Sequence, residues 1–102
     1  MGICSDEKLI YISAPFSEGA CAVMAIDYNG KKQWGISNIN GGMLAVDDKY
    51  LYMLLGPGTI GWGGPPDKEV AIRRIDKNTG RYAPWSDGKD MHTIYKVDEY
   101  TK

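Results

Sequence analysis

Short, largely apolar segments separated by polar breaks run through this chain, and none keeps a 3.6-residue apolar period long enough for a helix. Tyr, Val, Ile and Trp dominate these segments, as is typical of β-strands. The breaks between them are polar turns. The pair Asn29-Gly30, for example, tolerates the positive φ of a hairpin turn. The pattern predicts an all-β protein with strands at Gly2–Ser5, Lys8–Ala14, Ala20–Tyr28, Lys31–Ser37, Met43–Val46, Tyr50–Leu55, Glu69–Asp76 and Arg81–Trp85.

The chain also contains an internal repeat. The segment 6–11 (DEKLIY) matches 47–52 (DDKYLY) at an offset of 41 residues, and 26–30 (IDYNG) matches 75–80 (IDKNTG). Each copy then reaches a tryptophan, and the second copy carries about eight extra residues in its middle. Four strands in each copy predict two four-stranded antiparallel sheets, at about 2–38 and 42–88, with 89–102 as a C-terminal extension or the start of a further strand.

Composition excludes several classes of function. With 12 basic and 13 acidic residues among 102, the net charge of -1 offers no basic field for nucleic acid and no cationic patch for a membrane surface. No apolar run approaches the ~18 residues of a transmembrane helix. Two cysteines, Cys4 and Cys21, match no zinc motif; they are either buried thiols or one bridge.

The repeated turn carries a family resemblance. The segment 25–34 (AIDYNGKKQW) resembles the tryptophan-docking repeat of PQQ-like (quinoprotein-type) β-propellers, Ala-x-Asp-x-x-Thr-Gly-Lys-x-x-Trp. The second copy is similar, although the first lacks the Thr and the second has an extra residue before its Trp. The resemblance implies that each sheet is a propeller blade, and that six residues shape its turns and dock it on its neighbour: Asp27, Gly30, Trp34, Asp76, Gly80 and Trp85.

Two blades cannot close a propeller, which needs about four to eight. They would leave an apolar sheet face bare at each end, and such faces mark interaction surfaces. The expected partners are further propeller blades, either from a longer parent chain or from identical chains that assemble into a ring. A third, open alternative is a free-standing small β-sandwich or barrel.

The loops offer a second candidate surface. In PQQ-like propellers the loops that correspond here to 15–19, 38–42 and the insertion 56–67 lie on the face that carries active sites. The resemblance thus implies a face presenting Phe16, Asn38, Asn40 and Trp62, which would suit a sugar or peptide ligand. Alternatively, Trp62 only pins its own glycine-rich loop. Gly56–Gly61 formally matches G-x-G-x-x-G, but Pro65-Pro66 follows instead of a helix, so a dinucleotide site is not expected.

No catalytic, metal or cofactor site is expected from these residues. His92 is the only histidine, and the turn 76–81 departs from a calcium loop because Gly80 replaces a ligand and Arg81 replaces the required glycine. The sequence therefore favours a non-catalytic PQQ-like propeller module for binding or scaffolding, incomplete by itself. The alternative is part of a propeller enzyme, a quinoprotein dehydrogenase or a glycan-active protein, that contributes loops to a site. The resemblance implies a periplasmic or extracellular location, although the chain shows no export signal.

Overall fold

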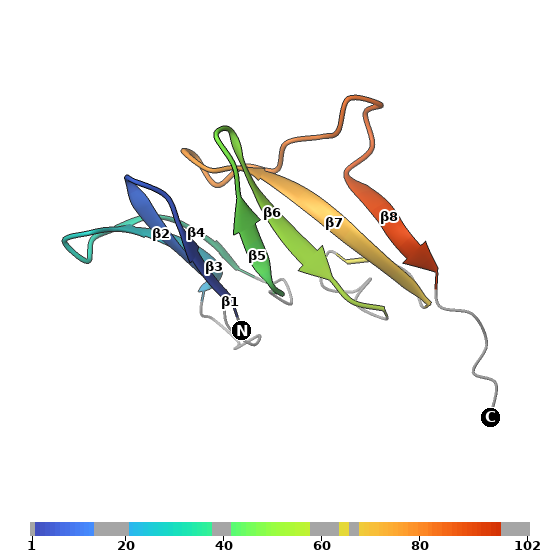
Figure 1. Cartoon of the computed structure of the whole chain (residues 1–102), viewed down its shortest axis with the longest axis horizontal. Coiled ribbons are helices and arrows are strands. Elements are labelled where there is room, and N and C mark those ends of the chain that lie inside the picture. The colour runs from blue at the N-terminus through green and yellow to red at the C-terminus, as the bar shows by residue number, and fades with distance from the viewer. Residues whose placement is uncertain (1, 14–20, 38–41, 58–63, 66–67, 97–102) are drawn as a thin grey trace.

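The computed structural model describes residues 2–13, 21–37, 42–57, 64–65 and 68–96 (Figure 1). These residues form two four-stranded antiparallel sheets. The first sheet has the order β1-β2-β3-β4, with β1 at Gly2–Ser5, β2 at Leu9–Ser13, β3 at Cys21–Asp27 and β4 at Lys32–Ser37. The second has the order β5-β6-β7-β8, with β5 at Leu44–Val46, β6 at Tyr50–Leu55, β7 at Glu69–Asp76 and β8 at Met91–Lys96. The prediction of an all-β chain with two such sheets is confirmed. Within the described part, no helix is long and apolar enough to cross a membrane.

The fourth strand of the second sheet lies elsewhere than predicted. Of the expected strand Arg81–Trp85, only Tyr82 pairs with β7, in an isolated bridge to Ile75. Pro84 has no N–H and cannot extend a β-ladder. The chain therefore leaves the sheet, turns back through residues 85–89 with the Trp85 N–H donating to the Lys89 carbonyl (2.9 Å), and pairs with β7 again as β8. Part of the segment 89–102 thus completes the second sheet.

One face of each sheet is buried against the other sheet. In β2, Tyr11 and Ser13 are fully buried, whereas Ile10 and Ile12 point to the opposite side and are only half-buried. In β6 the alternation is the same, and Leu51, Met53 and Leu55 are buried. The buried residues of both sheets form one apolar cluster, and β1 lies beside β5 where the sheets approach (Figure 1).

The faces of the two sheets can be named through the repeat. We call "front" the face of the first sheet that carries Tyr11, Ser13, Val23, Ala25 and Trp34, and "back" the face that carries Ile3, Ile10, Ile12, Met24 and Ile26. The same positions of the repeat place Tyr52, Leu54, Ile72 and Arg74 on the front of the second sheet, and Leu44, Leu51, Met53 and Ile75 on its back. Because Tyr11 and Leu51 belong to the same buried cluster, the front of the first sheet packs on the back of the second.

Candidate functional site

The residues predicted to bind a ligand, Phe16, Asn38, Asn40 and Trp62, all lie outside the described residues. That loop surface therefore stays a prediction. Within the insertion 56–67, the structure describes Gly56, Pro57, Gly64 and Pro65; Pro57 is exposed, whereas Gly64 and Pro65 are buried. At least this part of the insertion packs against protein rather than projecting into solvent.

The turns between the first two strands of each sheet are equivalent atom by atom. Asp6 Oδ1 accepts hydrogen bonds from the backbone N–H groups of the second and third residues after it (both 2.8 Å), and its Oδ2 accepts one from the Tyr11 hydroxyl (2.8 Å). Asp47 holds its turn in the same way and accepts from the Tyr52 hydroxyl (2.6 Å). Side-chain oxygens that accept backbone N–H groups two and three residues on stabilise such turns. The repeat thus extends to individual hydrogen bonds.

The turns that follow β3 and β7 are also alike. Asp27 Oδ1 accepts from the N–H groups of Asn29 and Lys31 (both 2.9 Å), and Asp76 Oδ1 accepts from that of Asn78 (2.9 Å). Gly30 (φ 88°) and Gly80 (φ 78°) occupy the left-handed region that favours glycine. The two glycines differ in their surroundings, because only Gly80 has a side chain of the other sheet against it.

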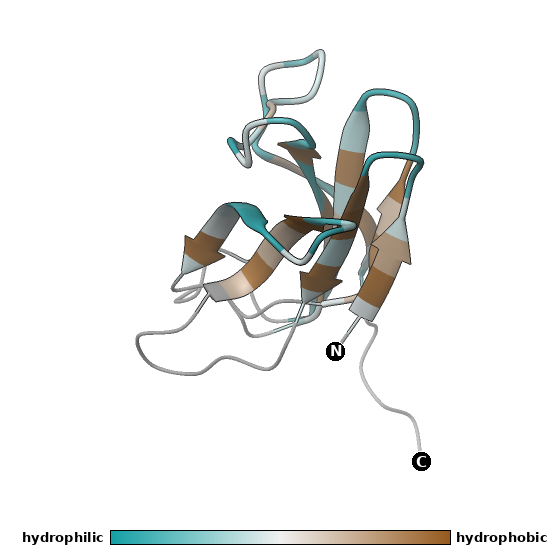
Figure 2. Cartoon of the chain, turned by 90° about the vertical axis from the view of Figure 1, so that its left-hand side faces the viewer, coloured by the Kyte–Doolittle hydropathy of each residue, from teal (hydrophilic) through white to brown (hydrophobic). Residues whose placement is uncertain are grey.

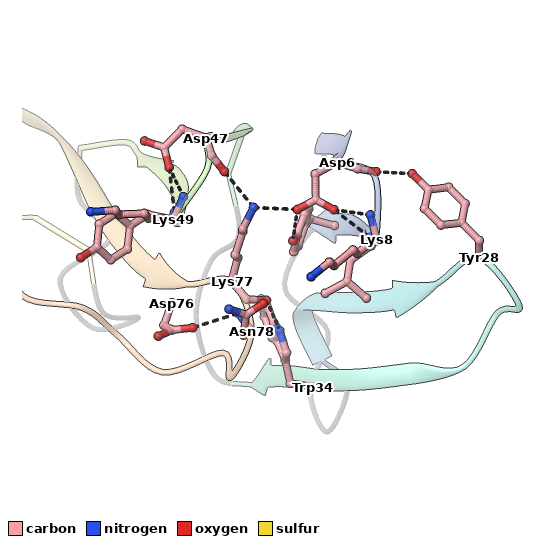
Figure 3. A network of polar contacts seen from close by, with 12 residues as sticks. Asp6, Lys8, Tyr28, Trp34, Asp47, Lys49, Asp76, Lys77 and Asn78 are labelled. Atoms are coloured by element: carbon pink, nitrogen blue, oxygen red, sulfur yellow. Dashed lines mark hydrogen bonds and ion pairs between the residues drawn. The ribbon is translucent and has the colours of Figure 1, made fainter.

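That side chain is Trp34, which projects from β4 of the first sheet. Its indole N–H donates to the carbonyl of Lys77 (2.8 Å), and a Cβ placed on Gly80 would come within 2.6 Å of the ring. Only 8% of Trp34 is exposed, and its ring centroid lies 6.2 Å from that of Tyr11. Trp34 therefore connects the outer strand of the first sheet to the turn after β7 in the second (Figure 3).

Trp85 occupies the matching place in the second copy but makes different contacts. Its indole N–H donates to the carbonyl of Ile72 in its own sheet (3.3 Å), and its ring stacks on His92 (centroids 4.1 Å apart, planes at 13°). It also lies 6.0 Å from the Tyr52 ring, on the front of the second sheet. Of the two tryptophans, Trp34 contacts the neighbouring sheet and Trp85 contacts its own.

Lys77 links the two sheets, although no local sequence pattern indicated it. Figure 3 shows its side chain between the two aspartate turns, with Nζ 3.0 Å from Asp6 Oδ2 and 3.0 Å from the carbonyl oxygen of Asp47. The side chains of Lys77 and Asp6 are only 15% and 17% exposed, so this ion pair is partly shielded from water. The repeat held a sequence signal for this contact: Lys77 stands where the first copy has Tyr28, so the two copies differ in charge at this position.

The electrostatics of the junction follow from these contacts. Burial alone would raise the pKa of Asp6, but hydrogen bonds from the backbone N–H groups of Leu9 and Lys8, and from Lys77 and Tyr11, outweigh it and hold that pKa well below its usual range. The Tyr52 hydroxyl and two backbone N–H groups lower the pKa of Asp47 to about 2. Both carboxylates are therefore ionised at neutral pH and are already used by their own turns.

This arrangement gives a testable dependence on pH. Because folding lowers the pKa of Asp6, this carboxylate stabilises the fold above its unfolded-state pKa of about 3.9, and the stabilisation is lost as the pH falls below that value. We expect Asp6→Asn to lower the free energy of unfolding by about 1–2 kcal/mol at pH 7 and to flatten its decline below pH ~4, as measured by urea unfolding at several pH values.

The matched control for that prediction is Lys77→Met, which removes the cation but leaves Asp6 in its turn. It should flatten the decline only in part, because the backbone N–H groups of Lys8 and Leu9 still favour the carboxylate. An Asp6→Asn protein with the wild-type slope would show that Asp6 does not contribute to the acid dependence.

A cleft of about 510 Å³ lies between the two aspartate turns, lined by Ser5, Asp6, Glu7, Val46, Asp47, Asp48 and Lys77. Although its wall is acidic, no group of three or more His, Cys, Asp or Glu side chains among the described residues is arranged to hold a metal ion. Cys4, on β1, is a free, half-buried thiol. Burial, with the charge of Asp6, raises the pKa of this thiol.

The two sheet faces that remain open are apolar. On the back of the first sheet, cross-strand neighbours are Ile3 with Ile12, Ile10 with Ile26, and Ile12 with Met24. None of these side chains is buried, and Ile3 is 71% exposed. Figure 2, which looks onto the side of the chain where the first sheet lies, shows apolar bands alternating with polar ones along the strands. On the front of the second sheet, an apolar groove of about 230 Å³ is lined by Met43, Leu44, Ala45, Tyr52, Leu54 and Ile72.

The described residues thus offer two kinds of surface: a polar junction whose charged groups serve turns and an inter-sheet ion pair, and two open apolar faces. Neither resembles an assembled set of catalytic groups in which a nucleophile, a base and a substrate pocket meet. No family model, no curated protein and no solved structure matches this chain.

Proposed function

We propose that this chain is a non-catalytic β-propeller repeat module for binding or scaffolding, whose two sheets continue a stack by packing against further sheets. The main observation behind the proposal is the front-to-back packing of the two sheets. Tyr11 is buried between the sheets, whereas its counterpart Tyr52 lies on the face that points away from the first sheet.

Front-to-back packing has a consequence that face-to-face packing lacks. If equal faces packed together, as in a two-fold symmetric sandwich, the pair would leave two identical faces open, and these could not repeat the contact made inside the chain. Here each sheet presents one face to the sheet before it and the other to the sheet after it, which is a head-to-tail contact. Such contacts either close into a ring or continue as an open array. The free-standing sandwich is therefore the reading that the packing favours least.

The composition of the open faces supports the same function. A solvent-facing sheet surface normally alternates with the buried one in polarity. In β2, however, Ile10 and Ile12 alternate with the buried Tyr11, so both faces of the strand are apolar. Apolar residues on both faces are what a sheet covered on both sides requires.

The proposal predicts the behaviour of the chain in solution. We expect light scattering after size-exclusion chromatography to give masses that are multiples of 11.3 kDa, with the assembled fraction increasing from micromolar to sub-millimolar concentrations. Because burial of apolar faces drives the association, it should persist at high salt. A monodisperse 11.3 kDa monomer across the whole range would contradict the proposed function.

A further inference from the structure

We propose that the partner covering the front of the second sheet is a second copy of this chain, which docks through the back of its first sheet. This inference rests on the proposed function and deepens it, because it names the partner and the residues that meet. The template is the interface already present inside the chain, where the same two faces of the repeat are packed together.

The second copy would dock through the back of its first sheet. This face is apolar, like the back of the second sheet, which is already packed inside the chain. In the internal interface the back of the second sheet contributes Leu44, Leu51, Met53 and Ile75. At the same positions of the repeat, the back of the first sheet carries Ile3, Ile10, Ile12 and Ile26. These four positions are again apolar and similar in size, whereas Val46, Leu55 and Tyr82 of the same interface correspond to Ser5, Ala14 and Lys32. The open back face can therefore fill the same role with a smaller apolar area.

The front of the second sheet, which would receive this back face, is also apolar. Val23 and Ser13 of the first sheet are replaced by Ile72 and Leu54 in the second, which makes the receiving face more apolar. Between Met43, Ala45, Tyr52, Leu54 and Ile72 lies the groove of about 230 Å³. On the first sheet, the corresponding side of β1 and β2 is covered by β5. In the docked pair, Ile3 of the second copy would therefore enter this groove.

On the receiving face this docking must cover the charged residue Arg74, which stands where the first sheet has the buried Ala25. Its guanidinium already lies 4.0 Å from the centroid of the Tyr50 ring and donates to the carbonyls of Ala83 and Pro84. A charge that keeps its own hydrogen bonds can be covered at far lower cost than a bare one. Arg74 is thus compatible with a docked sheet.

The turns predict the register of the docked pair. Within each sheet, the residue after the turn aspartate donates to the carbonyl of the first-turn aspartate: Tyr28 to Asp6 and Lys77 to Asp47. Lys77 also reaches across the interface to the Asp6 carboxylate. In the docked pair Tyr28 of the second copy takes the place of Lys77 and faces Asp47. A phenol cannot supply the missing positive charge, so we expect the association between copies to be weaker than the packing inside the chain.

The decisive experiment uses complementation. Leu54→Glu blocks only the front of the second sheet, and Ile12→Glu blocks only the back of the first; both side chains are half-buried on the open faces. Wild type should assemble, and each variant alone should be a monomer because it has one usable face. An equimolar mixture should form a 1:1 dimer of twice 11.3 kDa, through the back of the Leu54→Glu chain and the front of the Ile12→Glu chain.

Ser86→Glu is the matched control, because Ser86 is exposed and lies in the turn 85–89, outside the strands of both sheets. It should assemble as wild type does, and all variants should retain the wild-type circular dichroism spectrum. If wild type assembles but either single-face variant still self-associates, or the mixture stays monomeric, docking of a second copy in this orientation is overturned while the proposed function stands. A monomeric wild type would overturn both.

A gain-of-association variant keeps the inference falsifiable even if a glutamate variant fails to fold. Tyr28 is 59% exposed, and Tyr28→Lys copies the natural Lys77. By supplying the missing cation to Asp47 of the neighbouring copy, it should tighten self-association about fivefold at low salt, and less at high salt. The double variant Tyr28→Lys/Asp47→Asn should lose this gain. An unchanged association constant for Tyr28→Lys would overturn the proposed register.

Discussion

Replacing Trp34 by alanine should lower the free energy of unfolding by about 3–5 kcal/mol. The side chain is 8% exposed and lies between the sheets, so its removal leaves a cavity at the contact that joins them. It also deprives the Lys77 carbonyl of its hydrogen bond. Because a domain of this size is stable by only about 5–15 kcal/mol, a loss of this magnitude would leave much of the protein unfolded at moderate urea concentrations.

Two further variants separate the effect of the lost hydrogen bond from the effect of the cavity between the sheets. Trp34→Phe keeps an aromatic ring but removes the indole N–H, and should cost about 1–2 kcal/mol. Trp85→Ala removes a tryptophan that contacts its own sheet, and should cost clearly less than Trp34→Ala. Urea unfolding followed by circular dichroism measures all three. A loss below about 0.5 kcal/mol for Trp34→Ala, the range of ordinary surface substitutions, would show that Trp34 does not hold the sheets together.

Gly80→Ala should have the second-largest effect, about 2–5 kcal/mol, through two separate causes. Gly80 has a φ of 78°, which strains any residue with a Cβ. In addition, the new Cβ would lie 2.6 Å from a carbon of the Trp34 ring, so that either the ring or the turn must move. The substitution thus disturbs the same inter-sheet contact from the opposite side.

Gly30→Ala is a closely matched control for this prediction. Gly30 has a φ of 88°, but no atom lies within 4 Å of the position that its Cβ would take. It should therefore show the backbone cost alone, about 1–2 kcal/mol. The difference between the two variants in urea unfolding measures the steric contact with Trp34. Equal losses would mean that the turn after β7 does not press against that ring.

Most of the strands could be predicted from the sequence because their signals are local. Turn aspartates act on N–H groups two to four residues away, and glycines with positive φ act within a single residue. The strands β1, β6 and β7 have the predicted bounds. The strands β2, β3, β4 and β5 differ from the predicted bounds by one residue at one or both ends. The prediction of the last strand was wrong because Pro84 interrupts the ladder after a plausible beginning at Tyr82. The sequence does not show that the chain pairs with β7 again from Met91, nine residues later.

The polar junction could be predicted only in part. The sequence indicated two aspartate turns, yet it did not indicate the tyrosine hydroxyls that complete them or the lysine that links them. The signal for the tyrosines is present in both copies, as the spacing of five residues from Asp6 to Tyr11 and from Asp47 to Tyr52. The bond between Lys77 and Asp6 joins residues 71 positions apart, and no local pattern reports such a contact.

Seven of the eight described strands, the turns and the repeat follow from the amino-acid sequence, because each depends on side chains within a few residues of one another. Which side of each sheet is covered, in contrast, depends on how the two sheets pack. In β2 the run Leu9–Ile12 is apolar on both faces, so alternation cannot show whether Tyr11 or Ile10 points inward. That choice depends on the shape of the neighbouring sheet and on two contacts across it, Trp34 with Lys77 and Lys77 with Asp6, and it leaves the faces of Ile12 and Leu54 open.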